Sequence, residues 1–85
     1  MIDRTAEQLV ADAKVLDRSL KADEEAFQRD LLVLEGETDA GKFPTPERVL
    51  ALVVRKNQLE KARAGLNEVF ATAARLQERA NATAS

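Results

Sequence analysis

The side chains that most often carry catalysis are scarce in this chain of 85 residues. There is no histidine and no cysteine, so the commonest general base and the thiolate nucleophile are both absent. The two serines are Ser19, inside a predicted helix, and Ser85, at the end of the sequence. Neither lies in the strand-to-helix turn that exposes a nucleophilic serine. The sequence therefore predicts no enzymatic activity, no catalytic residues and no bound cofactor.

Two acidic segments are candidates for a cation site. Asp23, Glu24 and Glu25 are consecutive, and consecutive helical residues point in different directions, so their carboxylates would not converge on one ion. Residues 37–41 include two acids and a glycine, but too few ligands for a calcium loop. We interpret both segments as solvated surface and expect no metal ion.

The basic residues do not form a nucleic-acid-binding pattern. Arg55 with Lys56, and Lys61 with Arg63, make a modest basic face without interleaved aromatic residues. The formal net charge of the chain is −2 and its pI is about 5.1. We expect this face to be solvated or to lie against the first helix, and we expect neither nucleic acid nor a small-molecule substrate as a ligand.

The sequence also lacks the patterns of membrane and export segments. No apolar run approaches the roughly 18 residues of a membrane-spanning helix. The N-terminal segment is amphipathic and includes Asp3, whereas a secretory signal is basic and then uniformly apolar. These features predict that the chain has no membrane span and is cytoplasmic.

A first helix is predicted over about residues 4–35. Thr5 and Gln8 fit a capping box, and Asp3 is an alternative cap two residues earlier. Apolar residues then recur at steps of three, four or seven, which is the spacing of one helical face. Gly36 follows this pattern and is predicted to be the left-handed residue that ends the helix.

A second helix is predicted over about residues 46–80. Thr45 is a good N-cap, and Pro46 suits the first helical position. Apolar residues at alternating steps of three and four from Leu59 onward follow a heptad rhythm. Gly65, inside this helix, is either a point of close approach for another helix or a tolerated glycine. No glycine cap follows, so residues 81–85 are predicted to fray.

Two helices of similar length joined by a short bend, residues 36–45, favour an antiparallel pair. The predicted fold is therefore all-α, a single coiled-coil-like hairpin domain over residues 1–85. Opposed positions have residue numbers that sum to about 83, which places Leu16 against Leu66 and Glu24 within a turn of Lys56 or Arg63. The predicted interface between the helices contains Leu9, Leu16, Leu20, Phe27, Leu34, Leu52, Leu59, Leu66, Val69 and Leu76.

Two continuous apolar runs, residues 31–34 and 49–54, flank the bend. Consecutive residues cover the whole circumference of a helix, so one interface can bury only about half of each run. Either the loop covers the rest, with Phe43 folding back, or the rest is a protein-binding surface. We favour the second interpretation, and the predicted partner-binding residues are Leu31, Leu32, Val33, Phe43, Leu50, Val53 and Val54.

The chain resembles the small helical-hairpin components of bacterial type III secretion. The resemblance to the E-type co-chaperones rests on the Gly/Pro bend, Pro46-Glu47, residues 59–62 and the Leu/Val-rich segment 66–70. It implies a hairpin that pairs with a helical-repeat chaperone to keep the needle subunit soluble. The needle subunit itself is the less similar of the two, because its bend prolines are one residue farther apart and its C-terminus is apolar, whereas residues 81–85 are polar or small.

The sequence thus predicts a non-catalytic interaction module that binds a partner helix or a helical-repeat protein, with a secretion co-chaperone as its most concrete form. The alternative is a structural subunit that self-assembles into a helical bundle or filament. In both cases so thin a hairpin is expected to be completed by a partner protein or by further copies of itself, because a chain this short buries little apolar area.

Overall fold

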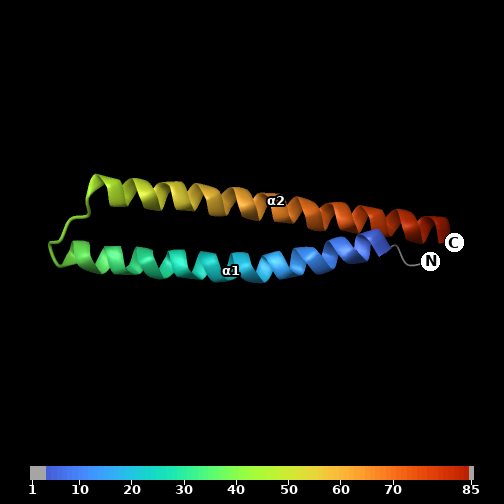
Figure 1. Cartoon of the computed structure of the whole chain (residues 1–85), viewed down its shortest axis with the longest axis horizontal. Coiled ribbons are helices and arrows are strands. Elements are labelled where there is room, and N and C mark those ends of the chain that lie inside the picture. The colour runs from blue at the N-terminus through green and yellow to red at the C-terminus, as the bar shows by residue number, and fades with distance from the viewer. Residues whose placement is uncertain (1–3, 85) are drawn as a thin grey trace.

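The computed structural model of the protein describes residues 4–84, and the side chains of residues 5–83. Within this range it contains two α-helices, α1 (Arg4–Asp39) and α2 (Pro46–Ala84), and no strand. The helices lie side by side and antiparallel, so that the start of α1 and the end of α2 share one end of a rod of 66 × 16 × 14 Å (Figure 1). The predicted all-α hairpin is confirmed.

α1 ends at a glycine, but not at the predicted one. Gly41 has a φ of +86°, whereas Gly36 lies inside α1 and its carbonyl accepts a helical hydrogen bond from the Ala40 N–H (3.1 Å). The Gly41 N–H donates to the Thr38 carbonyl (2.9 Å) and the Lys42 N–H to the Glu37 carbonyl (2.8 Å). This pair of bonds is the Schellman arrangement, which satisfies carbonyls that the helix itself leaves free. The helix therefore continues four residues beyond the predicted end at residue 35.

α2 begins as the sequence predicts. The Arg48 N–H donates to the Thr45 hydroxyl (3.3 Å), and the Val49 N–H donates to the Thr45 carbonyl (3.1 Å). Thr45 is therefore the N-cap and Pro46 the first helical residue, where its missing N–H costs nothing.

The outer ends of the helices differ from the expectations. Thr5 lies inside α1, which begins at Arg4, so it is not the N-cap; the alternative cap, Asp3, lies outside the described residues. α2 continues to Ala84 rather than ending near residue 80, and Gln77 Nε2 donates to Asn81 Oδ1 one turn later (3.1 Å). Of the segment predicted to fray, 81–84 is helical and Ser85 lies outside the described residues.

The contact between the helices has a seven-residue repeat. In α1 the buried apolar residues are Ala6, Ala13, Leu20 and Phe27, and in α2 they are Leu66 and Ala73. Ala13, Leu20 and Leu66 form one cluster against which Leu59, Val69 and Phe70 pack. Residues seven apart return to the same face of a helix, so this is the repeat of a coiled-coil pair. Several of the buried side chains are alanines, and the core is correspondingly thin.

Most of the predicted interface residues lie at this contact, with one correction. Leu20, Phe27 and Leu66 are buried, whereas Leu16 is 60% exposed. The other six are half-buried: Leu9, Leu34, Leu52, Leu59, Val69 and Leu76. Leu66 forms the buried cluster with Ala13 and Leu20, and the exposed Leu16 is not part of it.

The register and the rotation of α1 explain this correction. Arg55 pairs with Asp30 and Arg48 with Glu37, so opposed residue numbers sum to 85 rather than 83. Asp17, three residues before the buried Leu20, faces α2 through its ion pair with Arg63 and occupies the place that Leu16 was predicted to fill.

The two glycines at the end of α1 give a matched test of this geometry. Gly41→Ala places a Cβ in the left-handed region, which costs about 1–2 kcal/mol. Gly36→Ala removes a glycine from a helix interior, where a Cβ meets nothing within 4 Å, and is expected to stabilise by about 0.5–1 kcal/mol. Thermal unfolding followed by circular dichroism measures both, and each 1 kcal/mol shifts Tm by about 4–8 °C.

The two substitutions are only five residues apart, yet Gly41→Ala is expected to lower Tm and Gly36→Ala to raise it. If Gly36 were the terminating residue, Gly36→Ala would lower Tm and Gly41→Ala would be the milder change. That result would contradict the observed end of α1.

Candidate interaction surfaces

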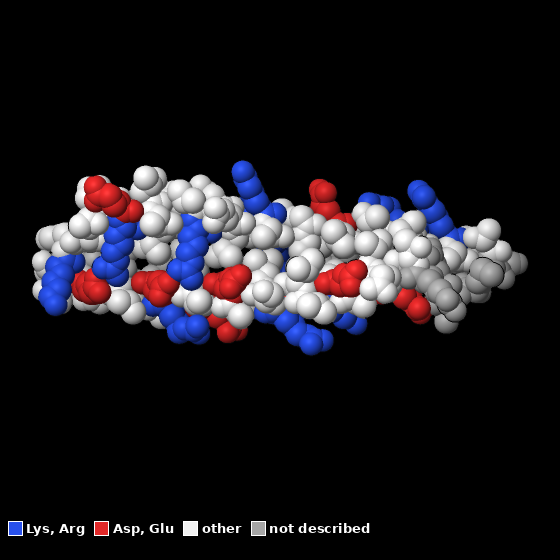
Figure 2. All heavy atoms as spheres, viewed as in Figure 1, with Lys and Arg blue, Asp and Glu red and all other residues white. Residues whose placement is uncertain are grey.

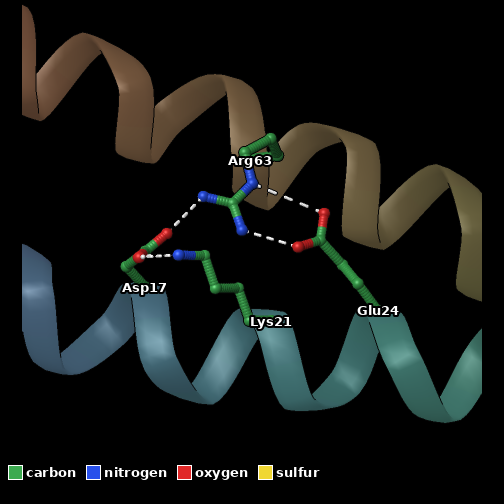
Figure 3. A network of polar contacts seen from close by, with 4 residues as sticks. All are labelled: Asp17, Lys21, Glu24 and Arg63. Atoms are coloured by element: carbon green, nitrogen blue, oxygen red, sulfur yellow. Dashed lines mark hydrogen bonds and ion pairs between the residues drawn. The ribbon is translucent and has the colours of Figure 1, made fainter.

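A four-residue polar network joins the two helices near the middle of the rod. Arg63 of α2 points between two carboxylates of α1 (Figure 3). Its Nη1 donates to Asp17 Oδ1 (2.5 Å), and its Nη2 donates to Glu24 Oε1 (2.6 Å). Lys21 Nζ contacts the second Asp17 oxygen at 3.1 Å. The predicted proximity of Glu24 and Arg63 is confirmed.

The network keeps its members charged. Hydrogen bonds from Arg63, and then from Lys21, lower the pKa of Asp17, and a hydrogen bond from Arg63 lowers the pKa of Glu24. The same two carboxylates raise the pKa of Arg63. The side chains of Asp17 and Arg63 are only 20% and 27% exposed, so each ion needs its partners. Because these groups satisfy one another across the helix pair, we interpret the network as a structural contact between α1 and α2.

Two further arginines of α2 reach across to α1 near the bend. Arg48 Nη1 donates to Glu37 Oε2 and Arg55 Nη1 to Asp30 Oδ2, both at 2.5 Å. The guanidinium of Arg55 also lies over the ring of Phe27, 5.6 Å from its centroid. Figure 2 shows this face, where basic side chains of α2 stand beside acidic side chains of α1 toward the bend. We call these two ion pairs the charged ladder.

The heptad positions of the charged ladder become apolar farther from the bend. Counting in sevens along α2, Arg48 and Arg55 are followed by Ala62, Val69 and Leu76. Counting back in sevens along α1, Glu37, Asp30 and Asp23 are followed by Leu16 and Leu9. Residues in one heptad series share a face, so one flank of the hairpin is charged near the bend and apolar in its other half.

This apolar half contains a groove between the helices with a volume of about 510 Å³. We call it the central groove, and it is lined by Leu16, Ser19, Leu20, Asp23, Ala62, Gly65, Leu66 and Val69. An added Cβ at Gly65 would meet nothing within 4 Å, so no part of the described chain approaches this glycine closely. The exposed Leu16 forms one wall of the groove.

A second apolar surface lies around the bend. We call it the bend patch, and its exposed fractions are Leu32 66%, Val33 55%, Phe43 81%, Leu50 63%, Val53 48% and Val54 46%. Leu31, the remaining residue of the predicted set, is half-buried. Phe43 does not fold back over the runs, so the loop leaves them uncovered.

Part of the bend patch faces away from the central groove. Val53 lies one heptad before Glu60, and Leu50 lies two heptads before Ala64. Glu60 and Ala64 line a different groove, on the Arg63 side of the pair, and are not part of the central groove. Leu50 and Val53 therefore belong to the opposite flank from Leu16.

The central groove was not among the predicted sites, although the sequence contains its signal. Ala62, Leu66, Val69 and Leu76 follow one another at steps of four, three and seven, and the sequence predicts that the last three face the first helix. In the structure Leu66 does so, whereas Ala62 is exposed and Val69 is half-buried at the groove wall. Periodicity identifies an apolar stripe, but it does not say how a second helix is rotated against it.

Metal and membrane sites are not found in the part of the chain that is described. Among residues 4–84, no group of three or more His, Cys, Asp or Glu residues is arranged to hold a metal ion. Neither α1 nor α2 combines the length and apolarity that crossing a bilayer requires. Comparison with protein-family models, curated proteins and solved structures gives no match for this chain.

Removing the arginine of the network tests its role in stability. Arg63→Met removes the guanidinium that Asp17 and Glu24 share and leaves Asp17 only its contact with Lys21, so we expect lower stability at neutral pH. In the native protein both pKa values lie below the unfolded values of 3.8 and 4.5. This stabilisation is therefore present above those values and lost as the pH falls through the folded pKa values, because the unfolded chain binds protons first.

Urea unfolding followed by circular dichroism, repeated from about pH 7 to about pH 2, measures this dependence. We expect a shallower acid dependence in Arg63→Met than in the native protein. Arg75→Met is the control, because the contact of Arg75 is with the Thr72 hydroxyl (3.1 Å) rather than with a carboxylate. An unchanged acid dependence in Arg63→Met would show that the network does not hold the helices together.

Proposed function

We propose that the protein is a non-catalytic protein–protein interaction module whose bend patch binds an apolar helix of a partner, either a single helix or one in a helical-repeat protein. The observation that carries the proposal is the gathering of six apolar side chains, each 46–81% exposed, at one end of the rod. Exposed apolar side chains gathered in this way usually mark an interface. Apolar residues of a partner helix, spaced three and four apart, suit such a surface.

The chemistry of this end favours a protein over other ligands. The nearby arginines Arg48 and Arg55 are already paired with Glu37 and Asp30, so they are poor phosphate contacts. A small molecule binds best in a concave pocket that encloses it, whereas these side chains project from the end of a thin rod. A helix can cover several projecting side chains at once.

Two biological forms of this proposal follow from the sequence. The resemblance to the E-type co-chaperones implies a helical-repeat partner and a role in keeping a secreted subunit soluble. The alternative is a structural subunit that assembles with its own copies, and the uncovered central groove supports self-association of some kind. A cytoplasmic location remains an expectation common to both.

A double substitution tests the bend patch. Leu50→Asp with Val53→Asp places charges where an apolar partner would pack, and both side chains are exposed enough that the hairpin should keep its helicity. A photo-crosslinking amino acid at Phe43 in the native cell is expected to give one major adduct with a different protein. The adduct should map to an apolar helical face and should be at least about tenfold weaker with the double substitution, because unpaired charges at an apolar contact weaken binding.

Val15→Asp is the matched control, since Val15 is 63% exposed but lies far from the bend. It should leave the adduct unchanged. Adducts of the chain only with itself would favour the structural subunit, and an adduct that is insensitive to the double substitution would rule out the bend patch as the binding surface.

A further inference from the structure

The apolar stripe of each helix is wider than the contact that the partner helix covers. Leu20 and Leu66 are buried in the interface, whereas Leu16, one turn from Leu20, is 60% exposed. The central groove is the uncovered part of this stripe. Gly65 adds a second indication, because glycine inside a helix is less favourable than alanine and no atom of the described residues lies close enough to require it there. In a packed bundle, however, a glycine lets another helix approach closely.

The surface of the chain is also larger than that of a compact protein. It exposes 6556 Å², whereas a folded monomer of 9.4 kDa exposes about 5000 Å². The difference of about 1500 Å² exceeds the roughly 800 Å² that each partner buries in a standard protein interface. The chain therefore exposes enough surface to form one further interface of standard size.

We propose that the central groove binds a second copy of this chain, giving a symmetric four-helix bundle. The two-fold axis runs along the groove, parallel to the rod, so that both bends lie at the same end. In this arrangement α1 of each copy lies beside α2 of the other, and every neighbouring pair of helices is antiparallel. This interface is distinct from the bend patch, because it uses the opposite flank from Leu50 and Val53.

The charges of the two helices select the second copy and its orientation. α1 contains ten acidic and five basic residues, and α2 contains four acidic and seven basic residues. A two-fold axis along the rod places acidic α1 beside basic α2 of the other copy. The alternative axis, across the rod, would place α1 beside α1 and α2 beside α2, and like charges across an interface disfavour association.

The charged ladder is self-complementary under the same axis. Asp30 and Glu37 of one copy come to the level of Arg55 and Arg48 of the other copy, because the axis keeps every residue at its height along the rod. Leu16 comes to the level of Val69 of the other copy for the same reason. Apolar groove therefore meets apolar groove, and acidic side chains meet basic ones.

Sedimentation equilibrium of the purified chain tests the association. We expect a mass of twice 9.4 kDa at high micromolar concentration. Leu16→Glu should raise the dissociation constant by about 100-fold or more, since it places a carboxylate in the apolar contact. Ala62→Glu, on the opposite wall of the groove, should also raise the dissociation constant. Both positions are exposed in the hairpin, so circular dichroism should show that the helices remain.

Val15→Glu is the control for Leu16→Glu. The two residues are adjacent and almost equally exposed, at 63% and 60%, but Val15 does not line the groove. The control should associate as the native chain does. A native chain that stays monomeric, or groove variants that associate as tightly as Val15→Glu, would overturn the proposal.

The orientation has its own measurement. The chain contains no cysteine, so Lys42→Cys places a single spin label at each bend. With both bends at one end, the labels should lie within about 20–30 Å, the width of a bundle of helices packed 8–10 Å apart. The crossed arrangement, centred on the groove, would separate them by about 75 Å, twice the 25-residue rise from Leu16 to Gly41. A distance near the larger value would overturn the proposed axis.

These results do not depend on the proposed function. The Leu50→Asp and Val53→Asp substitutions leave the central groove intact and should leave the mass unchanged. Loss of the partner adduct with an unchanged dimer would support the bend patch alone, and a dimer broken by Leu16→Glu with the adduct retained would support the groove alone. The two experiments therefore show separately whether the bend patch proposal or the central groove proposal fails.

Discussion

A pair of helices offers each helix a single neighbour, and this constraint governs the whole structure. Each helix can bury one stripe, which here includes Ala6, Ala13, Leu20 and Phe27 of α1. Among residues 4–84 there is no third layer to cover the remaining apolar side chains. The helices are therefore packed along one line of contact, and apolar side chains remain exposed at the bend patch and along the central groove.

Polar contacts determine how the helices are aligned along that line. Apolar side chains spaced by seven would pack almost as well after a shift of one heptad, because alanine and leucine recur at the same interval. In the observed register Arg63 lies between Asp17 and Glu24, and a shift of one heptad would replace one of these two carboxylates by Val10 or Leu31. Exposed ion pairs contribute little stability individually. Here the main effect of the Arg63 network is specificity, since only the observed register gives Arg63 both of its carboxylate partners.

Much of this fold follows from local sequence signals. Thr45 and Pro46 define the start of α2, and the two apolar-periodic segments define a hairpin. The end of α1 could not be chosen in the same way, because both Gly36 and Gly41 are glycines that follow a helical pattern. Only the backbone bonds of the bend distinguish them, and these depend on how the chain turns toward α2.

The interaction surfaces were predictable to different degrees. The bend patch follows from composition, since two all-round apolar runs exceed what one interface buries. The central groove depends on the rotation of α1, which is set by a competition between Leu16 and Asp17 for the position facing α2. A sequence stripe favours the leucine, but Asp17 gains a guanidinium partner at 2.5 Å only by facing Arg63.

The two surfaces are compatible because Leu50 and Val53 of the bend patch lie on the opposite flank from the central groove. A bundle formed through the central groove would cover Leu16 and leave Leu50 and Val53 exposed. The charged ladder separates the two regions, because Arg48 and Arg55 occupy the positions that continue the groove toward the bend. A hairpin that was apolar along its entire flank would allow copies to slide past one another. The change from apolar to charged side chains along one heptad series limits that freedom, and it allows one end of the rod to keep its apolar side chains for another protein.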